Sequence, residues 1–363
     1  MTSDLVVVGA GIVGLAHAFD AVERGLSVTV VERDAHATGA SVRNFGHGCF
    51  TAQDGVALDY ALVAREAWLR LAKEAGFWLR DKGTLVAARA DDELAVLREF
   101  AEIRDVRLLS PRQLPVPLDG VLGAALLPLD IRVDPREAVH RIARYLAERG
   151  VRFHWSTSAH TIEPGLVRTS RGPLAARKIV VAVGHDVDRH FPGTAEQHDV
   201  RRCELRMLRV ADPHGTTVEP AVLTGFSLLR YNGFARCPSH PLVRERLARE
   251  HPELVEIGLN LMFTQLPDGS LTIGDTHAYG QTVEPYRTEE LDERVLAETA
   301  RLLGVPRLTV LERWRGVYAS APGPFLVATP ADDVRVVSVT SGIGMTTALG
   351  LAPTVIDDLF QEL

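Results

Sequence analysis

Three glycines near the start of the chain have the spacing of a nucleotide-binding turn. The sequence Gly9-Ala10-Gly11-Ile12-Val13-Gly14 follows directly on the apolar run Leu5-Val6-Val7-Val8. In a strand–turn–helix unit, Gly9 permits the tight turn, Gly11 lets a pyrophosphate approach the backbone, and Gly14 lets the helix pack closely on the strand. The first N–H groups of that helix and the positive end of its dipole then bind the phosphates. The spacing therefore predicts a dinucleotide site.

A carboxylate stands where such a site needs one. Glu32 ends the second apolar stretch, residues 26–31, and a carboxylate at this place accepts hydrogen bonds from ribose hydroxyls. An incidental glycine turn is the alternative. The strand, the helix and Glu32 occurring together disfavour it.

A second glycine turn lies near the other end of the chain and bears on the choice between FAD and NAD. It joins an expected strand, residues 334–339, to a last helix expected over residues 347–363. The N-terminus of that helix would stabilise the negative charge of a reduced flavin ring. NAD needs no second anion site here, so this turn favours FAD, although an ordinary strand-to-helix turn is the alternative. The turn reads Ser341-Gly342-Ile343-Gly344-Met345-Thr346.

The hydrophobic pattern predicts the elements that position these turns. Helices are expected from Ile12 to about Glu23 and over residues 57–80, and β-rich segments over residues 151–184 and 200–285. Prolines break residues 111–128, which we interpret as a connection between domains.

The fold class predicted from this pattern is α/β. We expect a Rossmann-like FAD-binding domain, which resembles that of glutathione reductase, to be interleaved with an α+β substrate domain built on an antiparallel sheet. The predicted FAD-binding domain comprises residues 1–80, 130–200 and 300–363, and the substrate domain residues 81–129 and 201–299.

Composition excludes several other classes. The 363 residues are 46% hydrophobic and carry a net charge of −7, which disfavours nucleic acid and anionic membranes as partners. No secretory leader or membrane span is expected, so we predict a soluble cytoplasmic protein. The three cysteines show no paired spacing, so no metal is predicted. Four arginines are expected to line a solvated strand edge: Arg201, Arg202, Arg206 and Arg209.

Taken together, these segments resemble the D-amino-acid oxidase superfamily, which includes glycine oxidase and sarcosine oxidase. The resemblance covers essentially the whole chain and is carried by the two glycine turns, Ala182-Val183-Gly184 and residues 314–318. Two inner segments, residues 41–46 and 272–280, resemble a subgroup associated with aminophosphonate breakdown.

The resemblance implies a set of FAD contacts. Glu32 and Arg33 would hold the adenosine ribose, Ala159 would meet adenine, and residues 41–47 would lie beside the pyrophosphate and the flavin ring. The full set of expected cofactor residues is Gly9, Gly11, Ile12, Val13, Gly14, Glu32, Arg33, Ser41, Arg43, Asn44, Gly46, His47, Ala159, Ala182, Gly184, Gly342, Ile343, Gly344, Met345 and Thr346.

The chain departs from the sarcosine oxidases at three positions. Gly316 replaces the cysteine that tethers FAD there, so FAD is expected to bind non-covalently, with His47 as an alternative attachment point. Thr272 replaces a lysine implicated in oxygen activation, which leaves open oxygen or another electron acceptor. Thr346 replaces a lysine near the flavin carbonyl.

The expected reaction is FAD-dependent oxidation of a small amino or N-methylamino acid, which includes an aminophosphonate. Hydride passes to flavin N5 and the imine is then hydrolysed. An arginine suits the acid group of such a small amine. A 2-hydroxy-acid dehydrogenase using His277 or His47 as base, and a flavin-binding protein without turnover, are the alternatives. Candidate substrate residues are Arg43, Arg230, Arg236, Tyr231, His277, Tyr279 and Tyr318.

Overall fold

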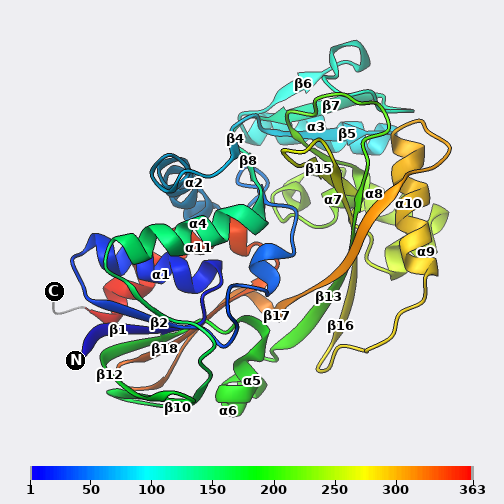
Figure 1. Cartoon of the computed structure of the whole chain (residues 1–363). Coiled ribbons are helices and arrows are strands. Elements are labelled where there is room, and N and C mark those ends of the chain that lie inside the picture. Colours follow the sequence, from blue (N-terminus) through cyan, green and yellow to red (C-terminus); the bar gives the residue numbers. More distant parts are fainter. Residues whose placement is uncertain (1, 361–363) are drawn as a thin grey trace.

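The computed structural model describes residues 2–360 and shows two sheet regions side by side. One carries parallel strands with helices over one face, and the other is largely antiparallel (Figure 1). The predicted fold class, a Rossmann-like α/β unit interleaved with an antiparallel sheet, is confirmed.

The parallel region begins with the predicted strand–turn–helix–strand unit. Its first two strands, β1 and β2, are mostly apolar and almost wholly buried, as expected where both faces of a strand are covered. In spatial order they are β9 (Arg152–His154), β2 (Val28–Val31), β1 (Ser3–Val8), β12 (Gly172–Val181) and β18 (Val334–Ser341).

Four helices cover one face of this region and form its main core (Figure 1). The last helix packs closely on its neighbour, since a side chain at Gly350 would overlap the backbone of Tyr60. The four helices are α1 (Ile12–Glu23), α2 (Val56–Ala75), α4 (Pro135–Glu148) and α11 (Gly344–Leu359).

Short elements complete the parallel region. A small three-stranded antiparallel sheet is separate from the main sheet, and further strands and turns flank β12. These elements are η1 (Ala40–Val42), β3 (His47–Gly48), β4 (Leu79–Arg80), β8 (Ile131–Val133), β10 (Ala159–Glu163), β11 (Leu166–Thr169), η3 (Gly184–Asp186), α5 (Val187–His190) and α6 (Pro192–Gln197).

The second region continues the main sheet with mostly antiparallel pairing and has a core of its own. In spatial order its strands are β6 (Arg107–Leu109), β7 (Gly123–Leu127), β5 (Thr84–Ala88), β14 (Ala221–Leu223), β15 (Met262–Gln265), β16 (Leu271–Gly280), β13 (Arg201–Val210) and β17 (Val310–Ala331). Its helices are α3 (Asp91–Ile103), η2 (Pro111–Gln113), α7 (Gly225–Leu228), η4 (Phe234–Arg236), α8 (His240–Glu250), α9 (Pro252–Glu256) and α10 (Glu290–Leu302).

The long strand β17 joins the two regions. Its first half, residues 310–320, pairs with β13, and its second half, residues 320–331, pairs with β18. Both pairings are antiparallel, and the first half of β17 pairs with a strand that the predicted boundaries assign to the substrate domain. The domain boundaries stay a prediction.

Several predicted element limits are corrected. Helix α2 ends at Ala75, where Gly76 adopts a left-handed conformation, and not at residue 80. Helix α11 begins at Gly344, earlier than expected, and residues 361–363 of the predicted helix lie outside the described residues. The proline-broken stretch is more than a connection, because it contains the sheet strand β7.

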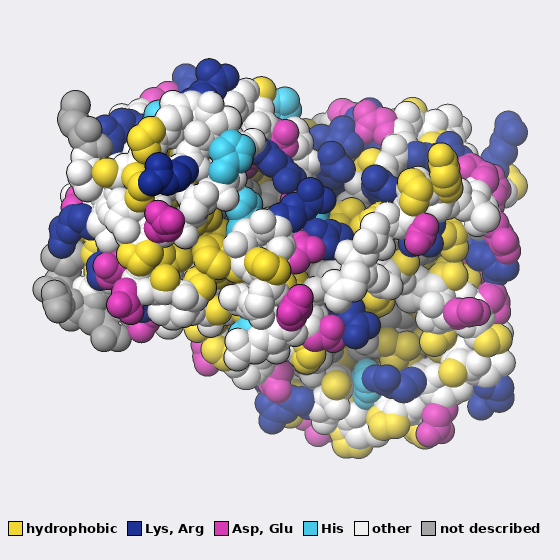
Figure 2. Space-filling view, turned by 90° about the horizontal axis from the view of Figure 1, so that it is seen from below, with side chains coloured by type: hydrophobic (Ala, Val, Ile, Leu, Met, Phe, Trp, Pro, Cys, Tyr) yellow, Lys and Arg dark blue, Asp and Glu magenta, His cyan; other side chains and the backbone are white. Residues whose placement is uncertain are grey.

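The prediction of a solvated arginine edge is wrong. Strand β13, which carries these arginines, is paired on both sides. Arg202 is buried and donates to Asp186 and Asp188, and Arg206 forms a two-point ion pair with Asp292. Lys and Arg side chains gather with acidic ones near the middle of the face shown in Figure 2.

None of the described helices combines the length and the apolar character needed to cross a membrane.

The contact between the first turn and its helix gives a stability prediction. A Cβ at Gly14 would overlap the carbonyl oxygen of Gly9, and both atoms belong to rigid backbone. We expect Gly14→Ala to lower the free energy of unfolding by about 1–3 kcal/mol, the usual cost of overpacking. Thermal unfolding measures this. Gly193→Ala is the matched control, because nothing lies within 4 Å of a Cβ there. Equal unfolding temperatures for the two variants would contradict the contact.

Candidate functional site

A cavity of about 570 Å³ lies where the parallel strands end beside the antiparallel sheet. Its walls come from the two glycine turns, residues 31–49, 157–160 and 182–190, and from strands β16 and β17. In α/β folds, ligands bind outside the carboxyl ends of the strands, because the turns there leave backbone groups free. The cavity is therefore the candidate site.

The first glycine turn presents backbone to this cavity. Gly9 has φ of +107°, a conformation that other residues rarely adopt. The Oγ atom of Ser41 accepts a hydrogen bond from the Ile12 amide at 2.8 Å. One carboxylate oxygen of Glu32 accepts from the Ala10 amide at 2.8 Å, and the other from the Asp34 amide at 3.1 Å. Glu32 thus holds the turn while it lines the cavity.

Two helix N-termini open on the cavity, and this is the feature that FAD requires. Helix α1 follows Gly11 and helix α11 follows Ile343, and neither of these N-cap residues forms a side-chain cap. Ser41 Oγ accepts from the Ile12 amide of α1, so the N–H groups after Ile12 and the first ones of α11 are the donors left for anionic oxygens. A Cβ at Gly11 would approach only the Ser41 hydroxyl, so space lies open in front of the backbone. The site fits the pyrophosphate of FAD at α1 and the flavin carbonyl edge at α11.

Most predicted cofactor residues line the cavity. Gly14 and Gly46 do not; they permit backbone contacts, Gly14 with Gly9 and Gly46 with Val133. The lining residues of the predicted set are Gly9, Gly11, Ile12, Val13, Glu32, Arg33, Ser41, Arg43, Asn44, His47, Ala159, Ala182, Gly184, Gly342, Ile343, Gly344, Met345 and Thr346.

Arg33 has a partner that the sequence did not reveal. Its guanidinium donates to Asp186 at 2.7 Å, and Asp186 also pairs with Arg189 and Arg202. Asp186 is 3% exposed. This cluster links the segment after β2 to α5 and β13. Arg33 therefore forms part of the cavity wall.

The part of the cavity where the predicted substrate residues gather is organised around Arg230. Its guanidinium donates to the hydroxyls of Tyr279, at 3.2 Å, and Tyr318, at 3.4 Å. Among the described residues, no ion pair includes Arg230. Although burial lowers the pKa of Arg230, Tyr318, Tyr279 and Asp275 outweigh that effect and raise the pKa overall. The result is a charged, half-buried cation that faces the cavity without a carboxylate bonded to it.

The other predicted substrate residues divide into two groups. Tyr231, His277 and Tyr318 line the cavity, and burial raises the pKa of both tyrosines, which keeps their hydroxyls protonated. Tyr279 does not line it but reaches it through Arg230. The prediction for Arg236 is wrong, because its exposed side chain pairs with Asp54 away from the cavity.

Sequence reasoning missed Asp275. This residue is 4% exposed, lines the cavity and lies in β16 at a register shift between β13 and β16. Bulges of this kind re-aim side chains beside active sites. The spacing could have indicated Asp275, because it is two residues from His277 and alternate residues of a strand lie on the same face of the sheet.

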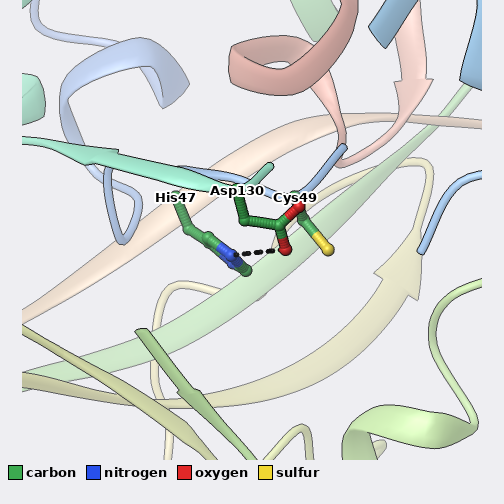
Figure 3. Close-up of side chains that lie close together, drawn as sticks. All are labelled: His47, Cys49 and Asp130. Atoms are coloured by element: carbon green, nitrogen blue, oxygen red, sulfur yellow. Dashed lines mark ion pairs between the residues drawn. The ribbon is translucent and has the colours of Figure 1, made fainter. Parts of the chain in front are cut away.

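The buried side chains of His47, Cys49 and Asp130 lie close together (Figure 3), and His47 and Cys49 also line the cavity. Their ligand atoms lie within 4.8 Å of one another, and the residue types suit zinc. The structure shows another use for them. One oxygen of Asp130 accepts from the Phe50 and Thr51 amides, and His47 Nε2 lies 2.7 Å from the Thr84 hydroxyl. Burial, with Asp130 adding to it, raises the pKa of the Cys49 thiol well above its usual value, which keeps it protonated.

The fold and the cavity match those of a flavin-dependent oxidoreductase. A family model described as DAO, FAD-dependent oxidoreductase, matches residues 4–357. The chain therefore belongs to this family, and the resemblance inferred from the sequence is confirmed at the family level.

Solved structures and a curated relative agree with this fold. L-proline dehydrogenase from P. horikoshii has a TM-score of 0.81 at 21% identity, over 99% of this chain and 94% of its own. Glycine oxidase from Geobacillus kaustophilus has a TM-score of 0.78 at 19% identity, over 99% and 95%. A D-amino acid dehydrogenase of Helicobacter pylori is 23% identical over 248 residues, which are 51% of this chain and 60% of the relative.

The open space at Gly11 gives a test of the cofactor position. We expect Gly11→Val to fold normally but to lose bound FAD, because the added side chain occupies the approach of the pyrophosphate. Flavin absorbance per protein measures the loss, and far-UV circular dichroism checks the fold. Normal flavin content in a folded Gly11→Val protein would refute this position of the phosphates.

Proposed function

We propose that this protein oxidises the C–N bond of a small amino acid or N-methylamino acid that carries an acid group. The single observation behind the proposal is Arg230, a charged guanidinium that faces the cavity with only tyrosine hydroxyls bonded to it. Arg230 is half-buried and, within the described residues, none of its hydrogen bonds goes to a carboxylate, so part of its capacity to bind an anion stays unused in the free protein. An acid group of the substrate supplies that anion.

The chain's residues act by positioning the substrate. FAD, when bound, would supply the electron-accepting chemistry, and the turn that contains Ile343 would help to hold it. Arg230 holds the acid group by charge-assisted hydrogen bonds, and Tyr318 adds a hydroxyl beside it. When the acid group is bound at Arg230, the adjacent carbon–nitrogen bond can take only a few orientations in the cavity. The imine that results is hydrolysed by water to a carbonyl compound and an amine.

The number of cationic side chains at the site indicates whether the acid group is a carboxylate or a phosphonate. A phosphonate would gain from a second arginine, for which Arg43 is the candidate. Arg43 lines the cavity, but its exposed side chain donates to the Arg315 carbonyl at 3.4 Å. We therefore propose a carboxylate as the principal acid group and keep the aminophosphonate as an outcome of the test. Oxygen or another acceptor then reoxidises the cofactor.

A panel of candidate substrates tests the proposal directly. We expect sarcosine, glycine, proline or D-alanine to reduce the bound flavin without oxygen, measured by loss of its visible absorbance. Aminomethylphosphonate reports on the phosphonate alternative, and glycolate and lactate report on the hydroxy-acid alternative. Reduction by the hydroxy acids alone would overturn the assignment to amine oxidation.

The role of Arg230 is tested with the best substrate of that panel. We expect Arg230→Ala to reduce kcat/KM by an amount that corresponds to about 2–4 kcal/mol, as for the loss of one partner of a buried charge pair. Arg236→Ala is the matched control, because Arg236 is exposed and paired with Asp54 outside the cavity. Equal kcat/KM values for the two variants would count against the anchor.

Non-covalent binding of FAD is the remaining part of the proposal. Gly316 lines the cavity where the sarcosine oxidases are expected to carry the attaching cysteine. We expect acid precipitation to leave a colourless pellet and a yellow supernatant that contains intact FAD. Colour retained in the pellet would contradict non-covalent binding, and peptide mapping would then test His47 and Cys49, which also line the cavity.

A further inference from the structure

The His277 ring has one defined tautomer. Its Nδ1 atom lies 2.7 Å from the carbonyl oxygen of Gly258. A carbonyl oxygen only accepts hydrogen bonds, so Nδ1 carries the proton. Burial lowers the pKa of His277, an effect that outweighs the opposing influence of Asp275. The ring is therefore neutral near pH 7, and its Nε2 atom presents a lone pair.

That lone pair faces a second acceptor. The Nε2 atom of His277 lies 3.7 Å from Oδ2 of Asp275. The other oxygen of Asp275 accepts a hydrogen bond from the Asn260 side chain at 3.0 Å. Within the described part of the chain, no donor is bonded to Asp275 Oδ2 or His277 Nε2. Both residues are less than a tenth exposed, and both line the cavity.

Two acceptors held this close create a site for a donor. Their lone pairs repel each other unless a proton or an N–H group lies between them, and burial strengthens that effect. A protonated amine meets the requirement, because it offers several N–H donors and a positive charge that the carboxylate balances. Asp275 is close enough to Arg230 to affect the pKa of its guanidinium. The guanidinium can therefore bind the acid group of a ligand whose amine lies near Asp275.

We propose that Asp275 and His277 form a binding site for the cationic amine of the substrate and accept its proton. This inference rests on the proposed function and deepens it, because it identifies the substrate as a zwitterion. The acid group binds at Arg230 and the ammonium group at the Asp275–His277 pair, so a simple carboxylic acid satisfies only half of the site.

The proton transfer is balanced within the pair. An N–H bond of the ammonium breaks, its electron pair stays on the substrate nitrogen, and the proton forms a new N–H bond at His277 Nε2. The carboxylate of Asp275 stabilises the imidazolium that results. The neutral amine that remains has the lone pair needed for oxidation of the adjacent carbon.

Two matched ligands separate the amine site from the acid site. 2-Aminoisobutyrate has the acid and ammonium groups but no hydrogen on its α carbon, so it binds without being oxidised. Pivalate has the same shape with a methyl group in place of the ammonium. Dissociation constants come from the shift that each ligand causes in the absorbance of the flavin in the holoenzyme.

We expect the wild-type protein to bind 2-aminoisobutyrate about tenfold or more tightly than pivalate, as a hydrogen bond between charged groups predicts. Asp275→Asn should abolish that preference by weakening 2-aminoisobutyrate alone, while Arg230→Ala should weaken both ligands. His277→Gln is the second variant, for use if Asp275→Asn does not retain FAD, and it should reduce the same preference. Arg236→Ala should change neither constant.

Each outcome has a distinct meaning. A loss of preference in Asp275→Asn or His277→Gln, with pivalate binding kept, supports the amine site. Equal binding of the two ligands by the wild-type protein, or an unchanged preference in both variants, overturns the amine site and leaves the acid site at Arg230 intact. No flavin response to either ligand at millimolar concentrations would contradict the proposed function and the amine site with it.

Discussion

The structure depends on a close backbone contact at the first turn. Gly9 and Gly14 bring the start of α1 against the end of β1, with no room for a side chain between them. This contact directs the start of the helix at the cavity, where the amides after Ile12 are available to an anion. Glu32 and Ser41 bind the amides of Ala10 and Ile12 and hold the turn.

The strand β17 relates the substrate end of the cavity to the cofactor end. Because one strand pairs first with β13 and then with β18, the antiparallel and parallel regions form one continuous sheet. The cofactor turn at Gly342 therefore approaches the Tyr318 ring, which a Cβ at that glycine would contact. The proposed hydride transfer needs the substrate carbon and the flavin N5 atom in fixed proximity, and a shared strand provides the required rigidity.

The charges of the substrate end are arranged for a small ligand. Arg230 offers hydrogen-bond donors, and Asp275 and His277 offer acceptors. Each of these three residues makes hydrogen bonds within the protein and still has donor or acceptor atoms left for a ligand. Polar groups buried in this way raise the free energy of the unliganded site. The same arrangement makes recognition selective, since a ligand that lacks one charge leaves one group unpaired.

The sequence by itself determined the parts of the protein that depend on local chain geometry. The strand–turn–helix unit, Glu32 and the last glycine turn were all predictable, because a glycine spacing and a buried strand act over a few residues. Tertiary structure decided what depends on pairing. It paired Arg202 and Arg206 of β13 with buried acidic partners, separated Arg236 from the cavity, and brought Asp275 beside His277 opposite Arg230. A sequence shows which residues carry charge, but partners far apart along the chain meet only through the sheet register and one bulge.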